Sequence, residues 1–181
     1  MTLNLDALFA AGEIKVHPKE DVAVIRIGIK TSTKPEEKGT FTMQMVPGVK
    51  VEETAPHGIR GAELKIIKKF EEVLVGNEVY IFGYPTSLGL KEIPQLDPLY
   101  PLLRRGIIAG RNFSTKSLVI DGAVYPGNSG GPVLEVSHQV FQTEFRMIGV
   151  IREFVPYKTT VLNSGYAIAT PMDFVLELID K

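Results

Sequence analysis

A serine flanked by glycines is the feature of this sequence best suited to chemistry. It lies in the hexapeptide Gly127-Asn128-Ser129-Gly130-Gly131-Pro132. A serine that attacks a carbonyl group needs backbone N–H donors aimed at the oxyanion that develops. Because Gly127 has no side chain, its N–H and that of Ser129 can face one point without steric cost. The hexapeptide therefore predicts a nucleophilic serine beside an oxyanion hole, and a glycine-rich hairpin with an incidental serine is the other interpretation.

Short apolar segments, separated by glycines and prolines, must position this hexapeptide. This pattern is typical of an all-β barrel or sandwich. The run over residues 22–29 is almost continuously apolar, as a strand buried on both faces would be, and the polar residues 30–39 after it predict a loop. We expect strands, in chain order, over residues 13–16, 22–29, 41–46, 79–82, 106–110, 117–120, 131–135, 147–151 and 166–169.

One α-helix is expected, at the C-terminal end of the chain. Thr170 can cap it, Pro171 suits its first position, and Asp173 completes a capping box. Apolar residues then recur at helical spacing. These residues are Met172, Val175, Leu176 and Ile179.

The order of these segments resembles the trypsin-like peptidase family, especially its bacterial HtrA (DegP-like) branch. The resemblance covers roughly residues 14–181, and the serine hexapeptide is its most specific element. It implies two perpendicular β-barrels with the active site in the cleft between them. The predicted fold is an all-β, chymotrypsin-like double β-barrel with an incomplete first barrel and a C-terminal α-helix. The segments that carry the resemblance are residues 17–26, 76–85, 105–110, 121–132, 147–151 and 163–168.

One peptidase domain is expected over residues 1–181. Residues 1–70 would form a partial first barrel and the connection between the barrels, residues 71–170 the second barrel, and residues 171–181 the helix. A first barrel without its opening strands would expose unpaired strand edges, which folded proteins normally avoid. The N-terminal part of the first barrel is therefore the part that this sequence lacks.

The resemblance also implies roles for individual residues. Ser129 is the nucleophile, and Asp21, directly before the apolar run, is the carboxylate that orients the catalytic histidine. The alternative for Asp21 is a solvated turn residue or cap. The backbone N–H groups of Gly127, Asn128 and Ser129 are expected to form the oxyanion hole.

A substrate pocket is implied by position as well. Ala123, six residues before Ser129, lies at the base of the pocket in this family, with Gly165, Tyr166 and Ala167 on the matching wall. No acidic residue stands at the base to bind lysine or arginine. The expectation is a modest apolar pocket that favours small or medium aliphatic side chains.

The general base has no evident candidate among the three histidines of the chain. Relatives place this histidine well upstream of the aspartate. His17 lies only four residues before Asp21, about 13 Å along an extended chain, which is too far for a direct hydrogen bond unless the segment folds back. His57 lies in a predicted surface turn and His138 in a predicted hairpin turn. Without a base, the Ser129 hydroxyl is a poor nucleophile at neutral pH.

Three explanations for the missing base stay open. The chain is a fragment whose first strands and histidine lie upstream, or a relative that has given up catalysis, or the base comes from another chain. The first is favoured because strands are missing as well as a residue. The expected function is a serine endopeptidase that hydrolyses peptide bonds through an acyl-enzyme on Ser129, inactive as this chain alone. The alternative is a catalytically silent peptide-binding or protein-interaction domain.

Composition excludes several other functions. With 20 basic and 21 acidic residues, the surface offers no general field for nucleic acid or anionic lipid. The chain has no cysteine, so disulfides and thiolate metal sites are excluded. No motif predicts a metal or nucleotide cofactor, and the expected partner is a polypeptide substrate. No run approaches the ~20 apolar residues of a membrane-spanning helix, and no signal peptide is visible, which predicts a cytoplasmic protein if Met1 is the true start. The oligomeric state is not predicted.

Overall fold

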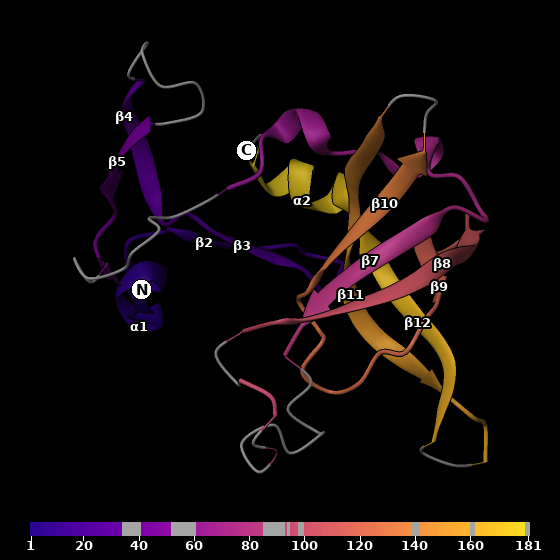
Figure 1. Cartoon of the computed structure of the whole chain (residues 1–181). Coiled ribbons are helices and arrows are strands. Elements are labelled where there is room, and N and C mark those ends of the chain that lie inside the picture. Colours follow the sequence, from indigo (N-terminus) through magenta and orange to yellow (C-terminus); the bar gives the residue numbers. More distant parts are fainter. Residues whose placement is uncertain are drawn as a thin grey trace. The chain divides into compact units, whose positions relative to one another are not determined.

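The computed structural model divides into two compact units (Figure 1). Unit 1 consists of Met1–Lys19, Ala23–Gly61 and Leu178–Lys181, and unit 2 of Glu20–Val22 and Ala62–Glu177. The structure describes residues 1–33, 41–51, 61–84, 93, 95–97, 100–138, 142–159 and 162–179.

The strands of unit 1 pair into three separate two-stranded antiparallel sheets (Figure 1). Within the described residues these sheets do not close into a barrel, in agreement with the expected incomplete first barrel. The pairs are β1 (Thr2–Leu3) with β6 (Val49–Lys50), β2 (Ile14–Val16) with β3 (Ala23–Ile25), and β4 (Gly28–Thr33) with β5 (Phe41–Met45).

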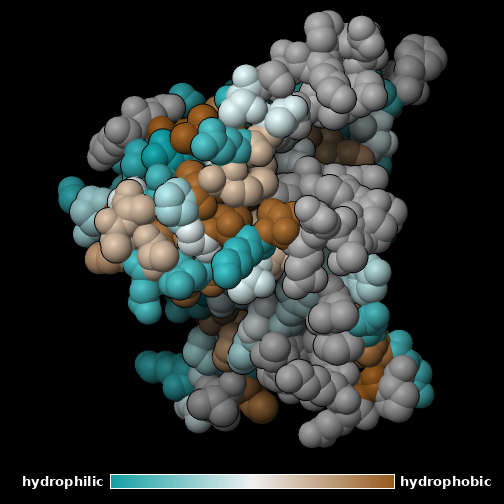
Figure 2. Space-filling view, turned by 90° about the vertical axis from the view of Figure 1, so that its left-hand side faces the viewer, coloured by the Kyte–Doolittle hydropathy of each residue, from teal (hydrophilic) through white to brown (hydrophobic). Residues whose placement is uncertain are grey.

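Unit 1 keeps many large hydrophobic side chains at the surface. Figure 2 shows brown hydrophobic residues exposed among teal hydrophilic ones. Two-stranded sheets cover only one side of each strand, so a longer sheet is needed to bury such residues. The exposed residues of this kind in unit 1 are Met1, Leu5, Phe9, Val16, Ile25, Ile29 and Val51.

A short helix, α1 (Leu5–Ala10), was not expected from the sequence. The side-chain oxygen of Asn4 accepts a hydrogen bond of 3.1 Å from Ala7 N and caps the helix. Leu8 is fully buried. A helix of six residues is not stable in isolation, so its packing through Leu8 must hold it.

The predicted strand over residues 22–29 is wrong as a single element. It divides into β3 and β4, separated by Arg26 and Ile27. Arg26 N donates to Glu13 O at 2.8 Å, and its guanidinium Nη2 donates to the Glu13 carboxylate at 2.9 Å. Ala23 and Ile25 are exposed, so the strand is not buried on both faces. Residues 30–33 of the predicted loop belong to β4, and residues 34–39 lie outside the described part.

Unit 2 contains a closed six-stranded antiparallel barrel in the order β10-β11-β12-β9-β8-β7 (Figure 1). Closure pairs every strand on both sides and leaves no free sheet edge. The barrel confirms the predicted fold class, and each strand extends beyond its predicted segment. The bounds are β7 (Glu78–Gly83), β8 (Leu102–Asn112), β9 (Ser117–Asp121), β10 (Pro132–His138), β11 (Thr143–Pro156) and β12 (Asn163–Pro171).

The barrel interior is apolar. On β7 the side chains alternate between buried and partly exposed, as a strand with one inner face requires. The core consists of Phe70, Val73, Val79, Ile81, Ile108, Leu118, Ile120, Val124, Val133, Ile148, Ile151, Ala167 and Ala169.

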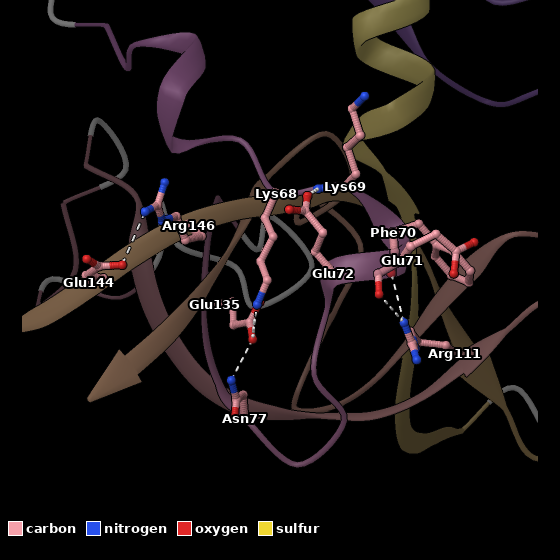
Figure 3. A network of polar contacts seen from close by, with 10 residues as sticks. All are labelled: Lys68, Lys69, Phe70, Glu71, Glu72, Asn77, Arg111, Glu135, Glu144 and Arg146. Carbon is pink, nitrogen blue, oxygen red and sulfur yellow. Dashed lines mark hydrogen bonds and ion pairs between the residues drawn. The ribbon is translucent and has the colours of Figure 1, made fainter. Parts of the chain in front are cut away.

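The segment before β7 lies against the barrel. It forms two short 3-10 helices, Leu64–Ile66 and Phe70–Glu72. Phe70 is only 1% exposed, and its ring meets that of Phe113 edge to face at 5.4 Å between centroids. Arg111 Nη1 donates to the carbonyl oxygens of Phe70 and Glu71, as Figure 3 shows. This part of the predicted connection therefore belongs to unit 2, and residues 52–60 lie outside the described part.

The C-terminal helix is confirmed as α2 (Met172–Ile179). Its predicted cap is wrong, because Thr170 belongs to β12 and pairs with Val150. Thr170 Oγ1 is buried and has no hydrogen-bond partner among the described residues. The Asp173 carboxylate instead accepts a hydrogen bond of 2.7 Å from Phe70 N. None of the described helices is long and apolar enough to cross a membrane.

Candidate active site

Ser129 lies on the turn that connects β9 to β10 in unit 2. Gly127 has φ +98° and Gly130 has φ +84°. Side chains rarely tolerate this left-handed backbone conformation, so glycine is needed on both sides of the serine. The spacing of the hexapeptide is thus a backbone requirement of the turn.

The peptide plane between Gly127 and Asn128 is fixed from both sides. Tyr84 N donates to Gly127 O at 3.1 Å, and Asn128 N donates to Tyr125 O at 2.9 Å. In a trans peptide the C=O and the N–H point in opposite directions. These two hydrogen bonds therefore hold the plane against rotation.

The side chain of Asn128 adds a second link to the same turn. It is fully buried, and its Oδ1 accepts a hydrogen bond of 3.0 Å from Tyr125 N. Asn128 and Tyr125 are thus joined reciprocally, each donating through its backbone N–H. The space for this side chain exists because residue 83 is glycine, since a Cβ on Gly83 would lie 2.3 Å from Asn128 Nδ2.

Two backbone amides next to the serine hydroxyl are unused. Among the hydrogen bonds of the described residues, none involves the N–H of Gly127 or of Ser129. Asn128 O accepts from Gly131 N at 2.9 Å, which directs the Ser129 N–H the opposite way. Of the three amides expected in the oxyanion hole, Asn128 N is already bound to Tyr125, so Gly127 N and Ser129 N are the two that can receive an anion.

The Ser129 hydroxyl is exposed and donates a hydrogen bond of 2.9 Å to the carbonyl oxygen of Arg152. Arg152 follows Ile151 on β11. Ile151 N donates to Gly131 O, and Ile151 O accepts from Gly130 N, both at 2.9 Å. β11 therefore holds the far side of the serine turn. Arg152 was not identified from the sequence, because a main-chain carbonyl contact requires no particular residue type.

A surface depression of about 360 Å³ opens beside Ser129. Its lining is mostly backbone and apolar side chain, so it has room for part of an extended peptide rather than for a charged group. It is lined by Phe82, Gly83, Tyr84, Pro101, Gly127, Ser129, Gly130, Gly131 and Pro132.

The structure brings together the segments expected to form the substrate pocket. Gly122 N donates to Gly165 O at 2.9 Å, which places the chain around Ala123 beside β12. Ala123 and Tyr166 are exposed, whereas Ala167 is fully buried in the barrel core. Gly165 has φ +91°, a conformation that suits glycine. The role of these residues in binding substrate stays a prediction.

Asp21 lies in the short segment between β2 and β3. Its side chain is exposed, and the described hydrogen bonds of Ser129 do not involve it. Its role in orienting a histidine stays a prediction.

The described histidines have other surroundings. His17 is buried in unit 1, where its Nδ1 accepts a hydrogen bond of 3.3 Å from Lys19 N. His138 is exposed at the end of β10, with Nε2 4.0 Å from the Glu78 carboxylate. His57 lies outside the described residues. Within the described part of the chain, the Ser129 hydroxyl is bonded to a carbonyl and not to a base.

Metal ligation was tested on the same residues. Across the ranges that the structure describes, no cluster of three or more His, Cys, Asp or Glu side chains could hold a metal ion.

Comparison with known proteins identifies the family. Residues 6–141 match the family model of the trypsin-like peptidase domain. The HtrA-type protease AlgW with decapeptide is a similar solved structure, at 20% identity and a TM-score of 0.42, over 63% of this chain and 31% of that chain. The HtrA-type protease AlgW with tripeptide has 19% identity and a TM-score of 0.43, over 63% of this chain and 34% of that chain. The chain thus spans about a third of the length of these proteins. None of the curated proteins compared with it matches. Since the family model covers more than half of the 181 residues, the chain belongs to the trypsin-like peptidase domain family.

Proposed function

We propose that this chain provides the nucleophile and the oxyanion hole of a serine endopeptidase. The observation that carries the proposal is the pair of unused amides, Gly127 N and Ser129 N, on a turn whose peptide planes are fixed by hydrogen bonds. Donors held in place before the reaction stabilise a developing negative charge without reorganisation, and one such donor contributes about 10²–10³ in kcat.

The reaction would proceed in two stages. Ser129 Oγ attacks the peptide carbonyl carbon while a base takes the hydroxyl proton, and the carbonyl oxygen becomes an oxyanion that accepts from the two amides. The base returns the proton to the leaving amine as the C–N bond breaks, which leaves an ester on Ser129. Water, deprotonated by the same base, then hydrolyses this ester and frees the carboxylic acid.

The base would come from outside the described residues, with Asp21 orienting it. In the described part, Ser129 Oγ donates to Arg152 O, so the hydroxyl has an acceptor but not a strong base. An enzyme of this class without one member of its triad keeps about 10³–10⁴-fold acceleration over water from the oxyanion hole and binding. The 181-residue chain by itself would therefore react slowly but specifically at Ser129.

A fluorophosphonate probe tests the proposal on the 181-residue protein, with and without added imidazole as an external base. We expect mass spectrometry to find the label on Ser129, at a rate that imidazole increases. Ser129→Ala would abolish the label, whereas Ser114→Ala, on a turn at the end of β8 outside the site, would keep it. No labelling of Ser129 even with imidazole would contradict the nucleophile assignment.

A second candidate function is a silent peptide-binding domain. The hydrogen bond from Ser129 Oγ to Arg152 O favours it, because the hydroxyl is engaged with a group that cannot accept its proton. Fluorescence anisotropy with labelled peptides separates the two functions. Equal peptide affinity of the natural protein and Ser129→Ala, together with an unreactive Ser129, would favour the binding domain.

A further inference from the structure

A cationic side chain lies over the aromatic ring next to the serine turn. Arg104, half-buried on β8, has its guanidinium carbon 4.8 Å from the ring centre of Tyr125. A guanidinium within about 6 Å of an aromatic ring centre is attracted to the ring face. The contact joins two segments that lie 21 residues apart in the sequence.

The ring is the evident partner of this guanidinium. Arg104 Nε is buried and has no hydrogen-bond partner among the described residues. Its neighbour Arg105 differs, because it is exposed and forms an ion pair of 2.6 Å with Glu78. The two adjacent arginines on β8 thus have separate roles, one toward the serine turn and one toward the surface.

Tyr125 transmits this contact to the oxyanion amides through its backbone. Its O accepts from Asn128 N and its N donates to Asn128 Oδ1. The peptide plane between Gly127 and Asn128 depends on the first of these bonds. A movement of the Tyr125 ring and backbone would therefore turn the amides on either side of Asn128.

We propose that Arg104 is a positioning residue for the oxyanion hole, because it holds the Tyr125 ring and so fixes the Tyr125–Asn128 hydrogen bonds. The proposal rests on the proposed function only for its effect on reactivity. The fixation of the turn is a property of the structure and can be measured separately.

Hydrogen exchange of the Asn128 amide, followed by NMR in the 181-residue protein, measures the fixation directly. Arg104→Met keeps the aliphatic stem and removes the charge. We expect the Asn128 amide to exchange about three- to thirtyfold faster, the range that corresponds to a cation–π contact. Arg105→Met, the matched control on the neighbouring residue, should leave this rate unchanged.

Substitutions of the ring provide a second, independent variant pair. Tyr125→Phe keeps the ring face and should preserve both the slow exchange of Asn128 and the rate of fluorophosphonate labelling. Tyr125→Leu removes the face and should change both, as Arg104→Met does. The free energy of unfolding of each variant shows whether an effect is local, since a loss of labelling from general unfolding would not be rescued by Phe alone.

The outcomes separate this inference from the proposed function. Unchanged exchange of the Asn128 amide in Arg104→Met and Tyr125→Leu would overturn the inference. Faster exchange with an unchanged labelling rate would refute the link to the oxyanion hole. If Ser129 is unreactive in the natural protein, the proposed function fails, and the exchange measurement still decides whether Arg104 fixes the turn.

Discussion

Lys68 Nζ lies 2.8 and 3.0 Å from the two carboxylate oxygens of Glu135, whose side chain is fully buried (Figure 3). Asn77 Nδ2 donates to the same carboxylate at 2.6 Å. Glu135 belongs to β10, the strand that follows the serine turn, and Lys68 to the segment before β7. The pair therefore attaches that segment to the strand that leads away from Ser129.

Removing the charge of Lys68 should strongly destabilise unit 2. Lys68→Met would leave the Glu135 carboxylate buried without a cation, which costs about 3–5 kcal/mol when one partner of a buried pair is lost. Urea unfolding, followed by circular dichroism, measures this loss. Lys68→Met with Glu135→Leu should recover most of it, because no buried charge then remains.

Lys65→Met is the control for that prediction. Lys65 forms an ion pair with Glu63 in which both side chains are mostly exposed, at 73% and 67%. Such pairs contribute about 0–1 kcal/mol. Equal losses for Lys65→Met and Lys68→Met would show that burial of the Lys68–Glu135 pair has no energetic consequence.

Gly131→Ala should damage the serine turn itself. A Cβ there would lie 2.0 Å from Phe82 O and 2.8 Å from Asn128 O, both of them backbone atoms. The turn must shift, and displacement of reacting groups by 1 Å costs about a hundredfold in rate. We expect the fluorophosphonate labelling of Ser129 to fall by up to that factor, with a loss of about 1–3 kcal/mol in the free energy of unfolding.

Gly110→Ala is the matched glycine control. A Cβ at Gly110 meets no atom within 4 Å, and its φ lies outside the left-handed region. The substitution should leave labelling unchanged and stabilise the protein by about 0.4–1 kcal/mol, because alanine restricts the unfolded chain. Reduced labelling in Gly110→Ala would mean that the effect at position 131 is not specific.

The barrel strands could be predicted because each buries one face. Val79 and Ile81 on β7 alternate with partly exposed residues, and that period is visible in the sequence. Unit 1 gave weaker signals. α1 contributes one buried side chain, Leu8, which is too few to define a helical pattern. The apolar run at β3 was taken as buried on both faces, but burial depends on the number of neighbouring strands, which a single segment does not reveal.

The candidate site shows the same division. The type of Ser129 and the glycines that its turn needs are written in the hexapeptide. The partners of that turn are not, because Arg152 binds Ser129 through its carbonyl oxygen and Tyr84 binds Gly127 through its backbone N–H. Main-chain contacts place no demand on residue type. The contact between Arg104 and Tyr125 joins separate strands and leaves no local pattern either.

The stability of unit 1 should fall in acid through Glu13. The hydrogen bond from Arg26 holds the pKa of Glu13 below the usual value of 4.5, and the positive charges of Arg26 and Lys15 act in the same direction. A lowered pKa in the folded state means that the stabilising effect is fully present above about pH 4.5 and is lost as the pH falls through the folded pKa. The free energy of unfolding, followed by the amide signals of β2 and β3, should show this acid dependence.

Glu13→Gln is the matched variant for the acid dependence. An amide does not titrate, so its free energy of unfolding should vary less with pH in the acid range than that of the natural protein. Parallel pH dependence in the two proteins would exclude Glu13 as the group responsible.

Asp173 should stabilise the junction between α2 and the segment at Phe70. Asp173→Ala leaves Phe70 N without its acceptor beside a residue that is 1% exposed, and an unsatisfied buried donor costs about 1–3 kcal/mol. Asp173→Asn keeps an acceptor oxygen and should lose less, even though it gives up the ion pair of 3.0 Å with Lys116. Urea unfolding of both variants tests this, and equal losses would assign the effect to the charge instead.

A change at Ala123 tests the proposed substrate pocket. Ala123 is exposed beside Gly165, and no acidic residue occupies its position. Peptidyl phosphonates with valine or lysine at the reacting position, used with imidazole, report the preference as a ratio of labelling rates at Ser129. The natural protein should favour valine, whereas Ala123→Asp should shift the ratio toward lysine by about ten- to a hundredfold, the range for a hydrogen bond to a charged group. Ala109→Asp adds the same charge to an exposed position of β8 and should leave the ratio unchanged. A preference of the natural protein for lysine would show that the side-chain pocket lies elsewhere, even if Ser129 is the nucleophile.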